Sequence, residues 1–172
     1  EGVGTIALII LGVTFVQLGS NVVGGSGLVY LVPRHGARAL RWPSYAWALI
    51  VAVFAWLVLQ RWALVPAGFE TPTVTIAFLR SLTGIHTNLL LGRERYGAQN
   101  ALLLAQAVML SVAFFILLQT ERATIMDYVH AAWIADGSIA LLSGLLIVDH
   151  APRSSAASHP LTELFRQGAM AQ

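Results

Sequence analysis

Five long apolar runs make up nearly all of this chain, and they restrict it to folds that a lipid bilayer can accommodate. Each run has about 18 residues or more, the length that a helix needs to cross a hydrocarbon core of ~30 Å. Only 10% of the residues are charged and the mean hydropathy is +0.73, so a globule in water would lack a polar surface. The sequence therefore predicts an all-α, polytopic transmembrane bundle with runs at Val3–Val32, Tyr45–Val65, Val74–Leu91, Ala98–Leu118 and Tyr128–Val148.

Charge and cysteine content exclude several classes of protein. All 10 basic residues are arginines, and most of them lie in the breaks between apolar runs instead of forming one patch, which argues against a nucleic-acid partner. The absence of cysteine excludes disulfides and thiolate metal sites. No spacing suggests a metal site, a phosphate-binding loop or a carboxylate pair for hydrolysis, so we expect no metal, no cofactor and no catalytic residue.

The distribution of arginine predicts the orientation in the membrane, because cytoplasmic loops retain basic residues during insertion. The first, third and fifth breaks are rich in arginine, whereas the second and fourth are poor. We therefore expect the N-terminus of this chain outside, on the periplasmic face, and its C-terminus in the cytoplasm. Val32-Pro33 and Trp42-Pro43 are predicted to frame the first cytoplasmic break, since proline disfavours helix around it. The arginines of the rich breaks are Arg34, Arg38, Arg41, Arg93, Arg95, Arg153 and Arg166.

Both ends of the chain look like interior positions of a longer protein. It opens on Glu1-Gly2-Val3-Gly4 without a methionine, and residues 161–172 read as the start of a sixth helix. We expect a helical bundle over residues 1–150, a flexible cytoplasmic linker over 151–160 and the beginning of a further helix over 161–172. The alternative is a natural five-span protein with a short tail.

Two charged residues stand inside apolar runs, where a charge is costly and marks either helix packing or a site. Arg80 lies on a polar face of the third run, and Asp136 is the one carboxylate well inside an apolar run. They enter from the same side at similar depth and could pair. A structural ion pair and an arginine that contacts a ligand both remain open. The polar face of the third run comprises Arg80, Thr83, Gly84, Thr87 and Asn88.

Other polar residues favour packing over chemistry. The first run carries small and amide side chains on one stripe, which permits close helix contact and could also line a polar cavity. We expect Gln106 and His86 to be hydrogen-bonded core residues, whereas His130 lies near the outer interface. The stripe of the first run comprises Gln17, Ser20, Asn21, Gly24 and Gly27.

One catalytic motif has to be weighed. Gly24-Gly25-Ser26-Gly27 matches the Gly-x-Ser-Gly that presents the nucleophile in rhomboid intramembrane proteases, with His86 or His130 as the possible base. The match is only four residues long and falls in a glycine-rich membrane helix. Ser26 and His130 are also predicted at opposite faces of the membrane, so we disfavour the protease interpretation.

Five segments of the chain carry a family resemblance: Glu1–Gly4, Val23–Arg34, Asn88–Arg95, Asn100–Gln106 and Phe165–Gln172. Taken in order, they resemble polysaccharide and O-antigen flippases of the multidrug/oligosaccharidyl-lipid/polysaccharide (MOP) exporter superfamily. The opening Glu1–Gly4 and the stretch Val23–Arg34 are similar to the start and the cytoplasmic exit of the second family helix. The cytoplasmic exit of the fourth family helix resembles Asn88–Arg95, and the start of the fifth resembles Asn100–Gln106. The start of the seventh family helix resembles Phe165–Gln172. On this resemblance the chain corresponds to family helices two to seven, without the first helix and the C-terminal lobe.

The resemblance implies export by alternating access across the bacterial inner membrane, with a lipid-linked oligosaccharide as substrate. Its partners would be membrane lipid and the remainder of the transporter. Arg80 would then offset the pyrophosphate charge, with Gln17, Asn21, Thr87 and Asn88 as sugar-facing groups. The alternative is a cation-coupled drug or small-solute antiporter of the same superfamily, in which Asp136 would be the coupling site. A structural or assembly subunit remains a further alternative.

Overall fold

The computed structural model describes residues 2–119 and 124–147, and in these residues every regular element is a helix. The predicted all-α bundle is confirmed, and five helical spans are long and apolar enough to cross a membrane, with α1 and α2 counted as one span. The predicted linker (151–160) and sixth helix (161–172) lie outside the described residues. The helices are α1 (Gly2–Gly24), α2 (Gly27–His35), α3 (Ala37–Trp62), α4 (Glu70–Gly92), α5 (Tyr96–Leu118) and α6 (Ile125–Ile147).

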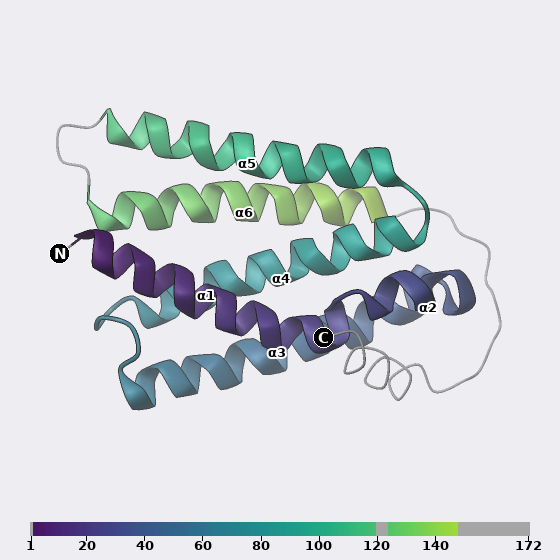
Figure 1. Cartoon of the computed structure of the whole chain (residues 1–172), viewed down its shortest axis with the longest axis horizontal. Coiled ribbons are helices and arrows are strands. Elements are labelled where there is room, and N and C mark those ends of the chain that lie inside the picture. The colour runs from purple at the N-terminus through teal and green to yellow at the C-terminus, as the bar shows by residue number, and fades with distance from the viewer. Residues whose placement is uncertain (1, 120–123, 148–172) are drawn as a thin grey trace.

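Helix α4 occupies the centre of the bundle and packs against each of the other five helices. Figure 1 shows α1, α4 and α6 running in one direction, while α3 and α5 return in the other. The α2–α3 hairpin and the α4–α5 turn lie at the same end of the molecule, which we call the arginine end. Its arginines are Arg34, Arg38, Arg41, Arg93 and Arg95.

Two glycines of α1 allow it to lie close beside α4. A Cβ atom on Gly12 would come within 2.9 Å of a Thr73 methyl carbon, and one on Gly24 within 2.8 Å of the Ile85 side chain. The later residue of α1 meets the later residue of α4, so the two helices run in the same direction. The small-residue stripe predicted on the first run therefore does act in helix packing at Gly24.

The first predicted helix is in fact two helices. A turn at Gly25 and Ser26 separates α1 from the shorter α2, whereas the sequence predicted one run over Val3–Val32. At Gly25 a Cβ atom would lie only 2.4 Å from the Asn21 carbonyl oxygen, so only glycine fits this turn. Apolar length alone does not reveal such a break, because the residues on both sides remain suited to lipid.

The prediction that Pro33 and Pro43 frame the first break was wrong. Pro33 lies inside α2 and Pro43 inside α3, and the two helices are separated only by Gly36, whose φ is +77°. A proline removes one backbone hydrogen bond, and the remaining bonds of the helix can hold on either side of it. Helix α3 therefore begins at Ala37, well before the predicted start at Tyr45.

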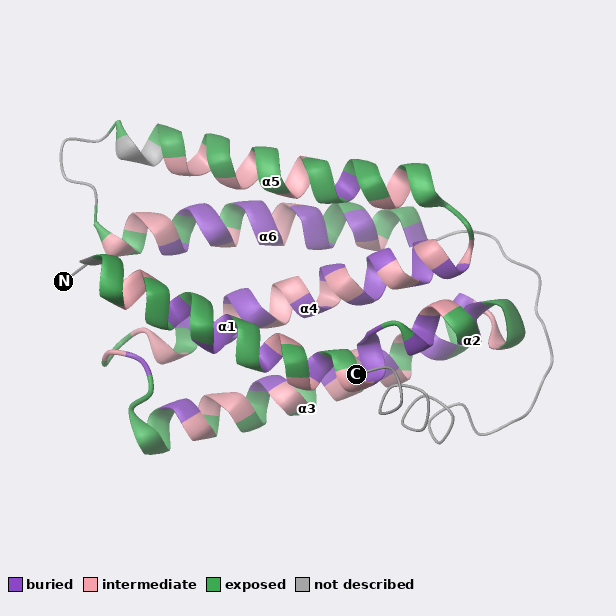
Figure 2. Cartoon of the chain, viewed as in Figure 1, coloured by how far each residue is buried: buried purple, intermediate pink, exposed green. Residues whose placement is uncertain are grey.

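The distribution of exposed side chains is that of a multi-pass membrane protein. Burial concentrates in α4 and α6, whereas α5 and the outer faces of α1 and α3 expose apolar residues (Figure 2). Leu104 on α5 is 67% exposed and Leu141 on α6 is 74% exposed. Such surfaces are unfavourable in water and favourable against hydrocarbon.

Candidate functional site

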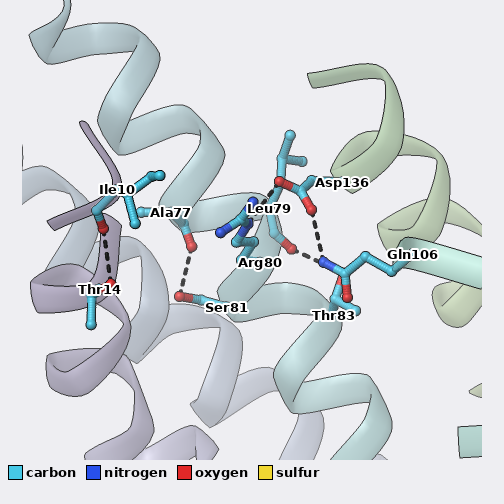
Figure 3. Close-up of polar contacts among 9 residues, drawn as sticks. All are labelled: Ile10, Thr14, Ala77, Leu79, Arg80, Ser81, Thr83, Gln106 and Asp136. Atoms are coloured by element: carbon cyan, nitrogen blue, oxygen red, sulfur yellow. Dashed lines mark hydrogen bonds and ion pairs between the residues drawn. The ribbon is translucent and has the colours of Figure 1, made fainter. Parts of the chain in front are cut away.

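The centre of the bundle contains a charged pair. The Arg80 Nε group of α4 donates a hydrogen bond to Asp136 Oδ2 of α6, at 2.9 Å (Figure 3). The Asp136 side chain is 0% exposed and the Arg80 side chain is 21% exposed. Both residues stand near the middle of 23-residue helices, which places the pair at the depth where charges are most costly. The pairing that the sequence left open is thus present.

A third helix contributes to the same cluster. Gln106, near the middle of α5, donates from Nε2 to Asp136 Oδ1 at 2.7 Å (Figure 3). Each carboxylate oxygen of Asp136 therefore accepts one hydrogen bond, and α4, α5 and α6 meet at this residue. Sequence reasoning identified Gln106 as a hydrogen-bonded residue but did not connect it with Asp136. Gln106 and Asp136 both lie midway along their helices, and this equal depth is the signal that could have connected them.

The side of α4 that carries Arg80 is only partly covered. Helix α1 contacts α4 at Ile85, α6 contacts it at Leu79, Arg80 and His86, and α3 contacts it at His86. One turn beyond Arg80, a Cβ atom added to Gly84 would meet nothing within 4 Å. Arg80 and Gly84 therefore lie on a strip of α4 that the other described helices cover incompletely. Among the described residues, no hydrogen bond uses the two terminal nitrogens of Arg80.

The remaining predicted substrate residues do not gather around Arg80. Thr87 is buried and its hydroxyl donates to the Gly84 carbonyl at 2.9 Å. Asn88 donates from Nδ2 to the Gly24 carbonyl at 2.9 Å, so it joins α4 to α1. Gln17 is half-buried and Asn21 exposed, both on α1. These bonds to backbone carbonyls use the Thr87 hydroxyl hydrogen and one of the two Asn88 amide hydrogens, donors that the sequence assigned to sugars.

A second polar cluster lies nearer the arginine end and joins α3, α4 and α6. His86 Nδ1 is 2.7 Å from Ser143 Oγ, and the Ser143 hydroxyl donates to the Ala140 carbonyl at 3.1 Å. The serine must then accept a proton from Nδ1, which leaves Nε2 to accept from the Tyr45 hydroxyl. His86 is thus a neutral, fully bonded core histidine, as predicted, but its partners Tyr45 and Ser143 were not foreseen.

The residues of the protease motif are not brought together. Ser26 is exposed in the turn between α1 and α2, and no hydrogen bond among the described residues joins it to a histidine. His86 is occupied by Tyr45 and Ser143, while His130 is exposed near the start of α6 at the end remote from the arginines.

The described ranges also contain no group of three or more His, Cys, Asp or Glu side chains placed to hold a metal ion. Comparison with protein-family models, with curated proteins and with solved structures finds no match for this chain. The resemblance to the MOP exporters therefore depends on the sequence segments named above, and the site must be interpreted from its own geometry.

Proposed function

We propose that this chain forms part of a transporter that moves a lipid-linked oligosaccharide or polysaccharide precursor across the bacterial inner membrane by alternating access. The single observation that supports this proposal is Arg80, a charged residue at mid-depth on an incompletely covered strip of the central helix. Charged residues at that depth are rare in membrane proteins, and those that face a cavity or the bundle interior often mark a substrate pathway.

The chemistry of Arg80 suits a phosphate group. Its Nε hydrogen is used by Asp136, and the terminal nitrogens remain as donors on the partly exposed side. Two such donors in a plane match the oxygens of a phosphate or pyrophosphate. Asp136 would hold the guanidinium in one orientation, so that the ligand is met by a preformed donor pair. Sugar contacts would come from Gln17 and Asn21 and from the acceptor oxygens of Thr87 and Asn88.

The antiporter is the second candidate, and it relies on Asp136. A coupling ion or proton needs a carboxylate that it can reach. The Asp136 side chain is fully buried, and its two oxygens already accept from Arg80 and Gln106. A cation would have to displace one of these donors first. This requirement makes Asp136 better suited to positioning Arg80 than to coupling, and it favours the flippase proposal.

The test is a lipid-flipping assay in vesicles that contain the intact transporter and a fluorescent lipid-linked oligosaccharide. We expect Arg80→Ala to abolish translocation. Arg61 is an exposed arginine in the last turn of α3, and Arg61→Ala should leave translocation unchanged. Because Arg80→Ala leaves Asp136 buried without its cation, the double variant Arg80→Met with Asp136→Leu serves as a second test. It should fold and remain inactive. Translocation by either Arg80 variant at the wild-type rate would refute the assignment.

The same assay separates the two candidates. Asp136→Asn keeps a hydrogen-bonding side chain beside Arg80 and removes the titratable group. Under the flippase proposal, Asp136→Asn should translocate the lipid more slowly than the wild type. Any effect of an imposed cation or proton gradient on the rate should be the same in both proteins. Gradient-driven solute exchange that disappears in Asp136→Asn would instead support the antiporter.

A further inference from the structure

The α2–α3 hairpin is basic and has no acidic residue of its own. Arg34, Arg38 and Arg41 lie within eight consecutive positions around Gly36, and the sequence contains no Asp or Glu between Glu1 and Glu70. Arg34 and Arg38 are exposed, as loop arginines that set orientation are expected to be. No acidic side chain on either helix of the hairpin offsets this charge.

Arg41 differs from its two neighbours because it is half-buried. Its Nε atom is shielded from solvent and has no hydrogen-bond partner, and no ion pair of Arg41 occurs among residues 2–119 and 124–147. Its guanidinium lies 5.6 Å from the centre of the Trp42 ring, a cation–π contact that leaves the N–H groups unused. A buried donor without an acceptor is unfavourable, so this group is suited to an anion that the chain does not supply.

The surroundings of Arg41 are those of a membrane interface. Tyr30 and Trp42 are exposed aromatic residues at this end of the bundle, a position that such rings favour at the level of lipid headgroups. Gly92 lies against Val32, where an added Cβ atom would approach to 2.7 Å. The α4–α5 turn, with two further arginines, is therefore held beside α2. An anion with an apolar body beside its charge would match both the arginines and the aromatic rings of this surface.

We propose that the arginine end binds the phosphate headgroup of an anionic phospholipid, with Arg41 as the central contact and Arg34 and Arg38 as flanking charges. Phosphate oxygens are acceptors that match the unused guanidinium donors, and basic pockets beside membrane helices favour anionic lipids. The acyl chains would remain among the exposed apolar side chains of the hairpin. This site is distinct from Arg80 and does not rest on the proposed transport activity.

The experiment compares lipid retention on the full chain. The protein is reconstituted with phosphatidylglycerol and phosphatidylcholine in equal amounts, extracted gently, and its bound lipids are counted by native mass spectrometry. We expect the wild type to retain phosphatidylglycerol preferentially and Arg41→Gln to reduce that preference about tenfold. Arg61→Gln, the matched control on the same helix at the opposite end, should retain the wild-type preference.

Two further variants keep the test decisive. Arg41→Lys preserves the charge but removes the planar donor fork, so it should lie between the wild type and Arg41→Gln. If Arg41→Gln fails to fold, the double variant Arg34→Gln with Arg38→Gln alters only exposed residues and should still reduce the preference by several-fold.

Three results would overturn the proposal. They are equal retention of the two lipids by the wild type, an Arg61→Gln loss as large as that of Arg41→Gln, and selective retention of an added isoprenyl pyrophosphate over phosphatidylglycerol. The last result would assign the arginine end to the transported substrate instead of to a membrane lipid.

Discussion

At the scale of single residues, Asp136 has the least freedom to change. Its carboxylate is fully enclosed, and Arg80 and Gln106 reach it from two other helices. An ionised carboxylate at this depth is tolerated only because a charge and a hydrogen bond compensate for its lost hydration. The cluster therefore determines how α4, α5 and α6 meet.

Asp136→Ala is predicted to destabilise the protein severely. It leaves the Arg80 charge and the Gln106 amide without their acceptor, and breaking a buried pair costs about 3–5 kcal/mol. Thermal unfolding in detergent would measure the loss. Asp127→Asn provides the control, since that carboxylate lies at the start of the same helix and accepts from the Thr124 backbone N–H and hydroxyl. Equal melting temperatures for the two variants would contradict this account of the cluster.

His86 is predicted to be the Nδ1–H tautomer. The Ser143 hydroxyl donates to a backbone carbonyl, so the ring must donate from Nδ1 and accept at Nε2. Nitrogen NMR of histidine-labelled protein would report one protonated and one bare ring nitrogen, assigned by loss of the signal in His86→Leu. Tyr45→Phe should shift the Nε2 resonance and cost about 1–3 kcal/mol. A ring protonated at Nε2 alone would show that the hydrogen-bond direction is reversed.

At the scale of elements, glycine positions determine where helices turn and how closely they pack. Gly25→Ala is predicted to destabilise the protein by about 1–3 kcal/mol, because its Cβ would collide with the Asn21 carbonyl and backbone must move. Gly84→Ala should be neutral or slightly stabilising, since its Cβ enters open space and alanine favours helix. Melting temperatures of the two variants check this. A larger loss for Gly84→Ala would mean that the strip beside Arg80 is filled.

The five spans and their helical type were predictable from the sequence, whereas the break within the first span and the boundaries near Pro33 and Pro43 were not. Apolar length identifies spans reliably because the bilayer demands it. Proline was misleading at Pro33 and Pro43, since each sits inside a helix that continues past it. The break at Gly25 depends on its close approach to the Asn21 carbonyl, and the apolar content of the sequence does not predict such a contact.

The candidate site was predictable only in part, for a geometrical reason. Depth along a helix can be counted, and it correctly suggested that Arg80 and Asp136 pair. The rotation of one helix about its axis relative to another is set by packing, so Gln106 and Tyr45 were not matched to their partners. The same limit explains why Asn88, placed on a ligand-facing stripe, proved to bind the Gly24 carbonyl.

At the scale of the whole molecule, the arginine end is predicted to face the cytoplasm. The chain has no cysteine, so single cysteines can be introduced at two exposed residues, Ala39 near the start of α3 and Ala67 in the connection between α3 and α4. A membrane-impermeant maleimide added to intact cells should label Ala67→Cys, whereas Ala39→Cys should react only after permeabilisation. The reverse pattern would invert the orientation, and labelling of both residues in intact cells would contradict a spanning arrangement.

The parallel course of α1, α4 and α6 has an electrostatic consequence. Three of the five spans point the carbonyl ends of their backbones toward the arginine end, and only α3 and α5 point the other way. Since each helix terminus acts as roughly half an elementary charge, the peptide groups leave a net negative partial charge at that end. Arg34 and Arg93 stand where α2 and α4 finish. The arginines from which a cytoplasmic location of this end is predicted thereby also offset the partial charge of the helix termini beside them.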